Sequence, residues 1–585
     1  MTSHVIKSKS ISFFVVGCGS RWVLQGYGRQ VRGSRNDGEK TERRYPQLLR
    51  PAAEVRSLTE LAVTEGYIAN PGGRRGFRIG IDASIWFFHA AYGREGENPE
   101  LRTLFFRCCR LLQTPLLPLF VFDGPKRPAI KRGKRVGGSA HWLTTGMKNI
   151  IQAFGFEWRT APGEAEAELA YLNRIGVIDA VLSDDADNFL FGATMVIRNP
   201  SSTLSGNRSR PVTNSEGRDD GNHVLTYRAS AISTHASVQI TRPGAILIAL
   251  LSGGDYIPAG LPGCGKRFAS GLARAGFGES LVEAVNTLKG ERLDDFLSEW
   301  RNQIRVELKT NSSGFLPSKK PTLAASLPDS FPSLPVLLSY VSPITSETER
   351  PCHPLPPVLW LNDPDPAQIA ALCELYFEWG VKDVIIKRFR TVLWPGIVCR
   401  ALRRKVVDTD GASLPDHKSD PKGRFTSNST GTTANVANLA LSQVLPSTSK
   451  KGSADQDSTS PLLLDVLSVR EHPSTDRTLE FRVLINPTTL VDRAASGVRG
   501  IRPPLDAPLV SDDAGSAENA KTKKKVKGPR SAPAAPTASL RLWLPAVMVR
   551  AVAPELVHGY EEKAQKRALK NAKKGAKGTA TRKAG

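Results

Sequence analysis

The sequence lacks the patterns that build zinc sites, disulfide frameworks and membrane spans. Its cysteines form no CxxC pair and no Cys/His spacing typical of zinc, so we expect no zinc site and reduced thiols in an intracellular protein. No apolar run approaches the roughly 20 residues of a membrane-spanning helix, the nearest N-terminal candidate being residues 11–17. We therefore expect a soluble protein. The seven cysteines are at positions 18, 108, 109, 264, 352, 373 and 399.

Acidic residues are absent from both ends of the chain. The first 35 residues hold six basic residues, several serines and no acid, which is the composition of an organelle transit peptide. Residues 521–530 hold six basic residues and residues 563–585 hold nine, again without an acid. These two runs are typical of nuclear localisation signals or of solvated tails that add nonspecific DNA affinity. We predict a nuclear protein, with a mitochondrial location as the alternative.

The excess of positive charge extends to the whole chain. Among 585 residues, 80 Lys and Arg face 56 Asp and Glu, which gives a net charge of +24. This balance favours a polyanionic partner such as nucleic acid, although basic tails explain much of it. Apolar residues make up 40% of the chain, enough for a sizeable core.

Seven carboxylates recur where predicted strands end or helices begin. Apolar strands are predicted at residues 78–81, 116–122 and 177–182, alternating with helical patterns, and this alternation predicts a parallel sheet covered on both faces. Parallel sheets bind ligands at the carboxyl ends of their strands. Clustered acids require a cation, and hard oxygen ligands suit Mg²⁺ or Mn²⁺. The alternative for any single Asp is a helix cap or turn. The seven are Asp82, Asp123, Glu164, Glu166, Asp185, Asp187 and Asp255.

Helical periodicity does not settle which glutamates act together. In the segment PGEAEAELA, which begins at Pro162, the (i, i+4) rule pairs Glu164 with Glu168 on one helix face. Glu164 and Glu166 reach one crevice only if Glu164 lies on an irregular entry to the helix. An ordinary acidic first turn, favourable to the helix dipole, is the alternative.

The motifs GIDAS, VFDG, APGEAEAELAYL, LSDDADNFLFG and LLSGGDYIPAGLPGCGKRFA, in this order over about residues 77–290, resemble the flap-endonuclease/XPG family of structure-specific nucleases. The resemblance implies a PIN-like α/β fold whose seven acids hold two Mg²⁺ ions, replaceable by Mn²⁺, and hydrolyse a phosphodiester at a DNA branch. It leaves Asp184 and Glu168 outside the motif and so decides the glutamate question against the periodicity rule. The segments FRVLINPTTLVDRAASGVRGIRPP and LRLWLPAVMVRAVAPELV resemble the C-terminal, chromodomain-like region of fungal Gen-type Holliday junction resolvases.

Basic and glycine-rich segments provide candidate DNA contacts. Six cations lie between Lys126 and Arg135, where the family keeps residues that contact the scissile phosphate, and Lys131 and Arg135 are spaced to share a helical face. A solvated basic loop is the alternative. LPGCGKR, directly after Asp255, resembles the helix-two-turn-helix element that holds duplex DNA and often a monovalent cation. The other DNA-binding candidates are Lys126, Arg127, Gly263, Gly265, Lys266 and Arg267.

The resemblance divides the chain into parts. We predict a disordered N-terminal extension (1–50), a nuclease core in two segments (51–140 and 141–256), a helix-two-turn-helix region (257–307), a linker (308–356), a small C-terminal α+β region (357–560) with a disordered insert (408–461), and a basic tail (561–585). Within this scheme residues 52–66 are expected to form a short helix, and the loop 199–222 is expected to be exposed.

Two departures from the family pattern bear on function. Only 40 residues, 124–163, separate the VFDG aspartate from the first glutamate, which leaves little room for the cap of flap endonucleases and favours the Gen-type resolvases. The family's Met-Gly start, with its hydrophobic wedge, is absent from MTSHVIKSKS. We expect an Mg²⁺-dependent endonuclease that acts on four-way junctions and 5′ flaps, monomeric in solution and pairing on a junction. The alternatives are a non-catalytic DNA-branch-binding protein and a flap endonuclease or exonuclease of the same family.

Overall fold

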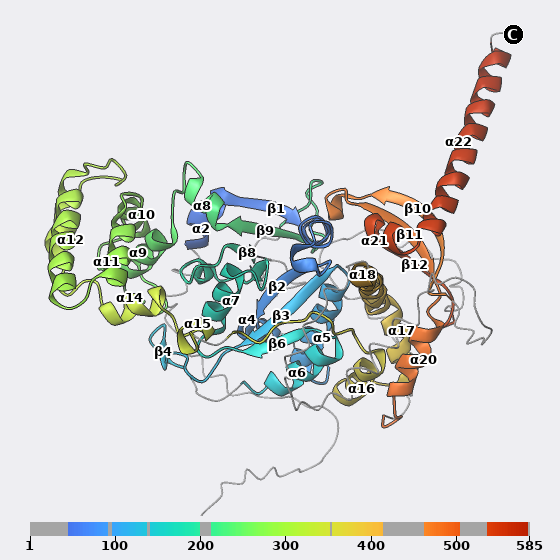
Figure 1. Cartoon of the computed structure of the whole chain (residues 1–585), viewed down its shortest axis with the longest axis horizontal. Helices are drawn as coiled ribbons and strands as arrows, with labels where there is room; N and C mark the ends of the chain where they lie inside the picture. The colour runs from blue at the N-terminus through green and yellow to red at the C-terminus, as the bar shows by residue number, and fades with distance from the viewer. Residues whose placement is uncertain are drawn as a thin grey trace, which may run out of the picture.

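A computed structural model describes residues 45–91, 96–136, 141–198, 212–351, 354–412, 461–502 and 535–582. A central sheet lies between a group of helices on one side and a smaller C-terminal sheet on the other, and helix α22 (Pro554–Arg582) projects away from the body (Figure 1). Most of the predicted N-terminal extension, most of the predicted insert and the basic run 521–530 lie outside the described residues.

The central sheet has seven strands in the order β1-β9-β8-β7-β2-β3-β6. Five consecutive members, from β8 to β6, run parallel, and β9 and β1 add antiparallel pairings at the opposite edge from β6. The predicted α/β class with a parallel sheet is therefore confirmed. The strands are β1 (Ala53–Ser57), β2 (Phe77–Asp82), β3 (Leu116–Phe122), β6 (Glu157–Thr160), β7 (Ala180–Leu182), β8 (Met195–Arg198) and β9 (His223–Arg228).

Helices cover both faces of this sheet because its strands are apolar on both sides. In β3 all seven residues are buried, and alternate side chains point to opposite faces. Phe120 joins one core with α4 (Ala83–Ala90), α5 (Pro99–Leu112) and α6 (Thr144–Ala153). Val121 joins the other core with α7 (Ala165–Arg174) and α9 (Arg242–Ser252).

The helix predicted over residues 52–66 is only partly present. Its first part is β1, which pairs with β9 at the sheet edge, and Ser57 ends the strand by capping the short helix α3 (Leu58–Leu61). A π-helical segment, η2 (Ala62–Ile68), follows. Pairing with β9 outweighs the local helical preference, since tertiary context overrides propensity.

The helical group beside the central sheet contains the region predicted as a helix-two-turn-helix. Helix α9 is followed by the turn 253–265 and α10 (Lys266–Arg274). The segment predicted as a linker, 308–356, carries three short helices, and its Leu323, Leu337 and Tyr340 are buried in the same core. The remaining elements are α8 (Ala229–Thr234), α11 (Phe277–Thr287), α12 (Glu291–Thr310), α13 (Pro321–Ser326), α14 (Leu334–Val341) and α15 (Ser346–Glu349).

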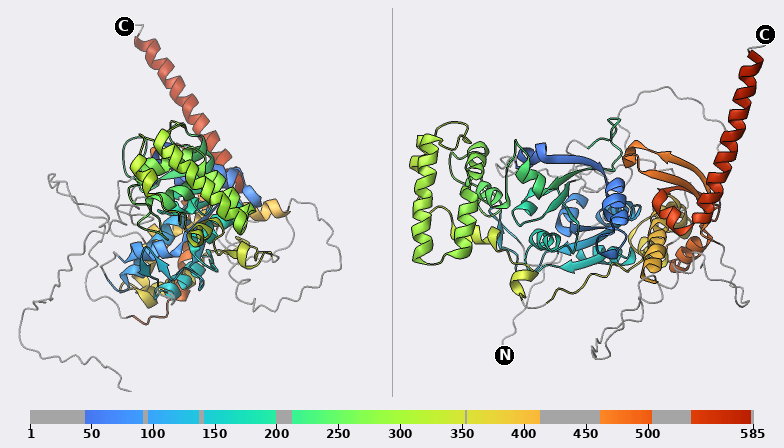
Figure 2. Two further views of the ribbon diagram at one scale, coloured as in Figure 1. Left: turned by 90° about the vertical axis from the view of Figure 1, so that its left-hand side faces the viewer. Right: turned by 45° about the horizontal axis from the view of Figure 1, so that its top comes forward.

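The C-terminal unit combines a three-stranded antiparallel sheet with helices, as predicted. The sheet consists of β10 (Leu463–Glu471), β11 (Leu479–Ile485) and β12 (Leu540–Pro545). Its helices pack against α5 and share one continuous hydrophobic core with the central sheet, and the right-hand view of Figure 2 shows the two units side by side. They are α16 (Pro366–Tyr376), α17 (Lys382–Val392), α18 (Trp394–Ala412), α20 (Thr488–Gly497) and α21 (Ala546–Val552).

Two smaller observations concern the expectations drawn from what the sequence lacks. Within the described residues, no helix combines the length and the hydropathy needed to cross a bilayer. The five described cysteines are free and buried, and burial raises the pKa of the Cys108 and Cys109 thiols.

Candidate active site

Two of the candidate acids stand at the carboxyl ends of adjacent strands. Asp82 ends β2 and caps α4, with its Oδ1 accepting from the Ser84 N–H at 2.7 Å. Asp123 follows β3, and its Oδ2 accepts from the Ser84 hydroxyl at 2.8 Å. The other oxygen of Asp123 accepts from the Ala165 N–H, in the first turn of α7, at 2.9 Å. Asp123 thus joins two strand ends to the helix that carries the glutamates.

The glutamates show the irregular helix entry on which the sequence argument depended. Glu164 is the extended N-cap residue of α7 (φ −79°, ψ 139°), and Glu166 lies one residue inside the helix. Both contact the Lys131 ammonium, Glu164 through Oε1 at 2.7 Å. Glu168 lies elsewhere and accepts hydrogen bonds from the Ser346 N–H and hydroxyl. The pairing of Glu164 with Glu168 is therefore wrong, because the first glutamate precedes the regular helix.

The remaining three acids come from loops at the same edge of the sheet. Asp185 follows β7 and accepts from the Asp187 N–H at 2.9 Å, and Asp187 lies in the short 3-10 helix η4 (Ala186–Phe189). Asp255 follows α9. Its carboxylate lies 3.0 Å from Lys131, so it shares that ammonium with the two glutamates. Tyr256, next along the chain, donates its hydroxyl to Glu164.

A basic hairpin, not a helix, places cations among these acids. Strands β4 (Ile130–Lys131) and β5 (Lys134–Arg135) pair across a turn whose two residues, Arg132 and Gly133, have φ of 54° and 71°. Two left-handed residues make a tight hairpin turn. The Arg132 guanidinium lies 2.6 Å from Asp255 and 3.3 Å from Asp185. The predicted shared helical face of Lys131 and Arg135 is wrong: Lys131 enters the site, and Arg135 is exposed.

Burial and mutual repulsion govern the protonation of the acids. Burial, followed by the charge of Asp123, raises the pKa of Asp82 to about 7. Burial also raises the pKa values of Glu166 and Asp187, and neighbouring carboxylates add to the effect. Burial acts on Asp255 in the same direction, but Lys131 and Arg132 outweigh it and lower its pKa. The cluster therefore requires positive charge to remain ionised.

The residues present suit a hard divalent cation. They offer carboxylate oxygens from five segments of the chain. The side chains of Lys131 and Arg132 already form ion pairs with several of these acids. Among the residues that the structure describes, no three His, Cys, Asp or Glu side chains stand in a ready metal-binding arrangement. Metal binding would therefore require the Lys131 ammonium to leave the three acids that it contacts.

The candidate DNA contacts fall into two groups. Near the acids, Arg127 lies 3.2 Å from Asp123, and Lys126 pairs with Glu349 of α15. In the turn between α9 and α10, Gly263 has φ of 80°, which glycine adopts without strain. Gly265 caps α10 and has open space around its Cα. Lys266 and the exposed Arg267 form the first turn of α10, so cationic side chains and backbone N–H groups lie together at a helix start that suits a phosphate.

Three contacts were missed from the sequence. Ser84 bridges Asp82 and Asp123, Tyr256 holds Glu164, and Arg132 occupies the place expected for Arg135. Gly133 was the sequence signal for the position of Arg132, because a glycine two residues after Lys131 fits a hairpin turn better than a helix. No comparable local signal marks Ser84 or Tyr256.

Comparison with known proteins gives matches over both folded parts. A sequence model of the XPG I-region matches residues 155–255, and a model of the Holliday junction resolvase Gen1 C-terminal domain matches residues 462–563. The human protein named flap endonuclease GEN homolog 1 is 32% identical over 241 residues, which are 37% of this chain and 24% of the relative. Flap endonuclease 1 of Sulfurisphaera tokodaii is 30% identical over 262 residues, which are 37% of this chain and 72% of that protein.

Solved structures agree with these matches. A eukaryotic junction-resolving enzyme GEN-1 with cesium superposes with a TM-score of 0.60 at 29% identity, covering 89% of this chain and 98% of the other. The Holliday junction-resolving enzyme GEN1 in complex with product DNA and Mg²⁺ gives a TM-score of 0.58 at 28% identity, covering 89% and 99%.

The fold, the acids at its carboxyl edge and these matches place the chain in the flap-endonuclease/XPG family of nucleases. Within that family it is of the Gen type, because its C-terminal unit matches the Gen1 C-terminal domain. The matched region spans only about a quarter of the length of the human relative.

Proposed function

We propose that the chain is an Mg²⁺-dependent, structure-specific DNA endonuclease that hydrolyses phosphodiesters in four-way junctions and 5′ flaps. The main support is the convergence of buried carboxylates at the carboxyl edge of a parallel sheet, where Lys131 contacts three of them at once. A cluster of carboxylates beside a polyanion is electrostatically unfavourable unless bound cations neutralise its charge. The resemblance to GEN1 enzymes, one of them solved with product DNA and Mg²⁺, supports the substrate class.

The metal site would comprise the seven carboxylates. Two divalent ions held there would lower the pKa of an attacking water and would stabilise the leaving oxygen of an in-line displacement. The chain's own contribution is positional, because Asp123 is fixed by the Ser84 hydroxyl and the α7 backbone, and Asp82 by the Ser84 N–H. Mn²⁺ has the same ligand preference and would substitute. The proposed ligands are Asp82, Asp123, Glu164, Glu166, Asp185, Asp187 and Asp255.

The DNA would be held by two basic surfaces. At the hairpin, Lys131 and Arg132 form ion pairs with Asp255. Metal ions bound to the acids would replace these ion pairs, and the two side chains could then contact the scissile phosphate. Exposed Arg135 extends the same surface, as do Lys126 and Arg127. At the α9–α10 turn, the duplex backbone would contact Gly263, Gly265, Lys266 and Arg267, and a monovalent cation would bind there. GEN-1 structures with potassium, sodium and cesium support the binding of a monovalent cation.

We further propose the domain boundaries, the assembly and the location that the sequence suggested. The protein would be a monomer in solution and would pair on a four-way junction, where two nicks are needed. Its basic runs would direct it to the nucleus, where branched DNA in repair and recombination provides the substrate, and the mitochondrion remains the alternative. The match of residues 462–563 to the Gen1 C-terminal domain supports a C-terminal unit of the Gen type.

The deciding experiment is cleavage of labelled four-way junction, 5′-flap and plain duplex DNA by the full-length protein, with Mg²⁺ or with EDTA. Paired nicks on opposite strands of the junction, dependent on Mg²⁺, are expected. The double variant Asp185→Asn/Asp187→Asn should cut at least about a thousand-fold more slowly, because lost transition-state stabilisation of about 4 kcal/mol corresponds to that factor. It should still bind the junction.

The matched control is Asp295→Asn, which changes an exposed acid on α12 and should cut like the unmodified protein. Continued cutting by the double variant would remove Asp185 and Asp187 from the catalytic site. Junction binding without any cutting by the unmodified protein would instead favour the non-catalytic DNA-branch binder.

A further inference from the structure

A ladder of three rings leads from the core of the nuclease to its surface. The Phe87 and His141 rings are stacked, with centroids 4.9 Å apart and planes at 17°. The His141 and Trp142 rings are stacked in turn, at 5.9 Å and 28°. Phe87 is 5% exposed, whereas Trp142 is 66% exposed. The ladder therefore ends in an indole that presents much of its surface to water.

The buried end of the ladder is tied to the candidate active site. Phe87 packs against Phe122 at 6.1 Å, and Phe122 directly precedes Asp123. Phe87 also lies on α4, the helix capped by Asp82. Five residues of helix rise about 7.5 Å, so Phe87 lies within a short distance of the acid edge. Because stacked rings hold one another in fixed orientations, the position of the Trp142 indole is coupled to the strand end that carries Asp123.

Basic residues lie on the segments that flank this indole in the chain. The hairpin Ile130–Arg135 lies a few residues before it in the chain, and α6 just after it carries Lys148, whose ammonium lies over the Phe122 and Trp158 rings. An exposed ring on a segment flanked by basic residues suits a ligand that has both phosphates and flat faces. A single nucleotide unit of unpaired DNA provides both chemistries.

We propose that Trp142 is a stacking platform for an unpaired nucleobase next to the branch point, with His141 and Phe87 as the rings that position it. This proposal rests on the proposed nuclease function. A stacked base requires a free π-face, which paired bases inside a duplex lack, so the platform adds affinity only for substrates with an unpaired strand. It would thereby help the enzyme to distinguish a flap from plain duplex.

The test measures affinity without cutting. Full-length protein with Ca²⁺ in place of Mg²⁺ is titrated with a 5′-flap DNA and with a fully paired duplex of equal length. Trp142→Ala should weaken flap binding by about five- to a hundred-fold, the range of losses when an aromatic ring that stacks on a base is removed. Its affinity for the duplex should stay the same. Trp142→Phe should keep most of the flap affinity.

Matched controls separate stacking from general effects. Leu375→Ala removes another exposed apolar side chain, 54% exposed and on α16, and should change neither affinity. Because Trp142 is exposed, its substitution should leave thermal unfolding unchanged, which a melting curve checks. Intrinsic tryptophan fluorescence provides a second measurement: an oligothymidine should quench the unmodified protein more strongly than Trp142→Phe.

The outcomes separate the platform from the proposed function. If Trp142→Ala loses the same affinity for flap and duplex DNA, or loses none for either, the platform is overturned. Junction cleavage by the unmodified protein would then still support the proposed function. If the unmodified protein binds the flap no better than the duplex and cuts neither, the nuclease function and the platform fail together.

Discussion

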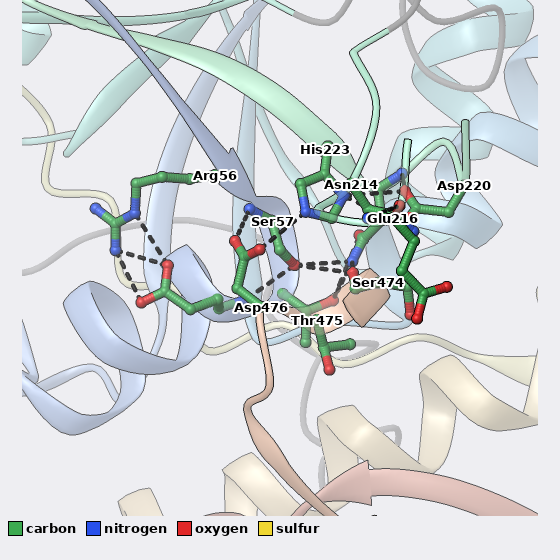
Figure 3. Close-up of polar contacts among 12 residues, drawn as sticks. Arg56, Ser57, Asn214, Glu216, Asp220, His223, Ser474, Thr475 and Asp476 are labelled. Atoms are coloured by element: carbon green, nitrogen blue, oxygen red, sulfur yellow. Dashed lines mark hydrogen bonds and ion pairs between the residues drawn. The ribbon is translucent and has the colours of Figure 1, made fainter. Parts of the chain in front are cut away.

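Asp476 lies at the turn of the C-terminal β-hairpin and accepts a hydrogen bond from His223 of the central sheet, with Oδ1 and Nε2 2.9 Å apart (Figure 3). The other carboxylate oxygen accepts from the Ser57 N–H. His223 is 1% exposed, and its Nδ1 contacts Asp220 at 3.1 Å. The buried imidazole of His223 thus joins the start of β9 to a turn far along the chain. Its two carboxylate partners favour the charged form of the imidazole.

This contact predicts a stability that depends on pH. Burial lowers the pKa of His223, but its hydrogen bonds with Asp476 and Asp220 outweigh burial and raise the pKa above the ordinary 6.5. A raised folded-state pKa stabilises the fold fully below about pH 6.5, and the contribution is lost as the pH rises through the folded-state value. Asp476→Asn should therefore lower the free energy of unfolding by about 1–2 kcal/mol at pH 6 and by much less at pH 9.

Asparagine is the suitable replacement because residue 476 has φ of 45°, a left-handed conformation that Asn tolerates. Urea unfolding between pH 6 and pH 9 checks the prediction, with the exposed Glu471→Gln on β10 as the control. A destabilisation of the same size at every pH would show that the loss does not come from the charge of His223.

Glu166 and Glu168 lie two residues apart on α7 and should respond in opposite ways to replacement by Gln. Glu166 is 6% exposed with its pKa raised by burial, and its partner Lys131 also pairs with Glu164 and Asp255. Glu166→Gln therefore removes a buried acid without leaving the ammonium unpaired. Its unfolding free energy should change by less than about 1 kcal/mol, while Mg²⁺-dependent cleavage should be lost. Thermal unfolding and junction cleavage of the same preparation measure the two effects.

Glu168→Gln should show the reverse pattern. Glu168 is 1% exposed and accepts two hydrogen bonds from Ser346, with Arg159 at 3.7 Å. Weakening these contacts should cost about 1–3 kcal/mol of stability and leave cleavage per folded molecule close to normal. Loss of cleavage with unchanged stability would place Glu168 in the catalytic site and contradict its structural role.

The sequence predicts the sheet well because its signals are local. The strand predicted at 116–122 coincides with β3, and the one predicted at 78–81 lies within β2, since apolar strands bounded by polar turns are visible in a short window. The convergence of the acids also follows from sequence, because parallel strands bring their carboxyl ends to one edge. Helical periodicity does not predict the position of Glu164. Its side chain reaches the site because the residue has the extended backbone of a helix N-cap and not a helical one.

What the sequence did not predict depends on long-range contacts or on turn chemistry. His223 and Asp476 are 253 residues apart, and no local pattern links them. The Lys131–Arg135 segment was interpreted as a helix because its cations are spaced by four, yet Arg132 and Gly133 both adopt positive φ and close a hairpin. Residues 53–57 form a strand only because β9 is available to pair with them.

Lys131 should compete with metal for the acids. Its ammonium lies 2.7 Å from Glu164 and 3.0 Å from Asp255 and also contacts Glu166, so a divalent ion must displace it before it can bind there. Burial lowers the pKa of Lys131, but these three carboxylates outweigh burial and raise it, so the side chain stays charged. Lys131→Gln should therefore bind Mn²⁺ about ten-fold more tightly in the absence of DNA, a change of about 1.4 kcal/mol. Electron paramagnetic resonance of free Mn²⁺ measures this affinity directly.

The same substitution should reduce cleavage, because the cation proposed to meet the scissile phosphate is gone. Tighter metal binding together with slower cutting is a combination that a general loss of structure does not produce. Arg135→Gln is the matched control, since Arg135 belongs to the same hairpin but is exposed, and its Mn²⁺ affinity should remain that of the unmodified protein. Unchanged or weaker Mn²⁺ binding by Lys131→Gln would show that the ammonium supports the acid cluster and does not compete with the metal for it.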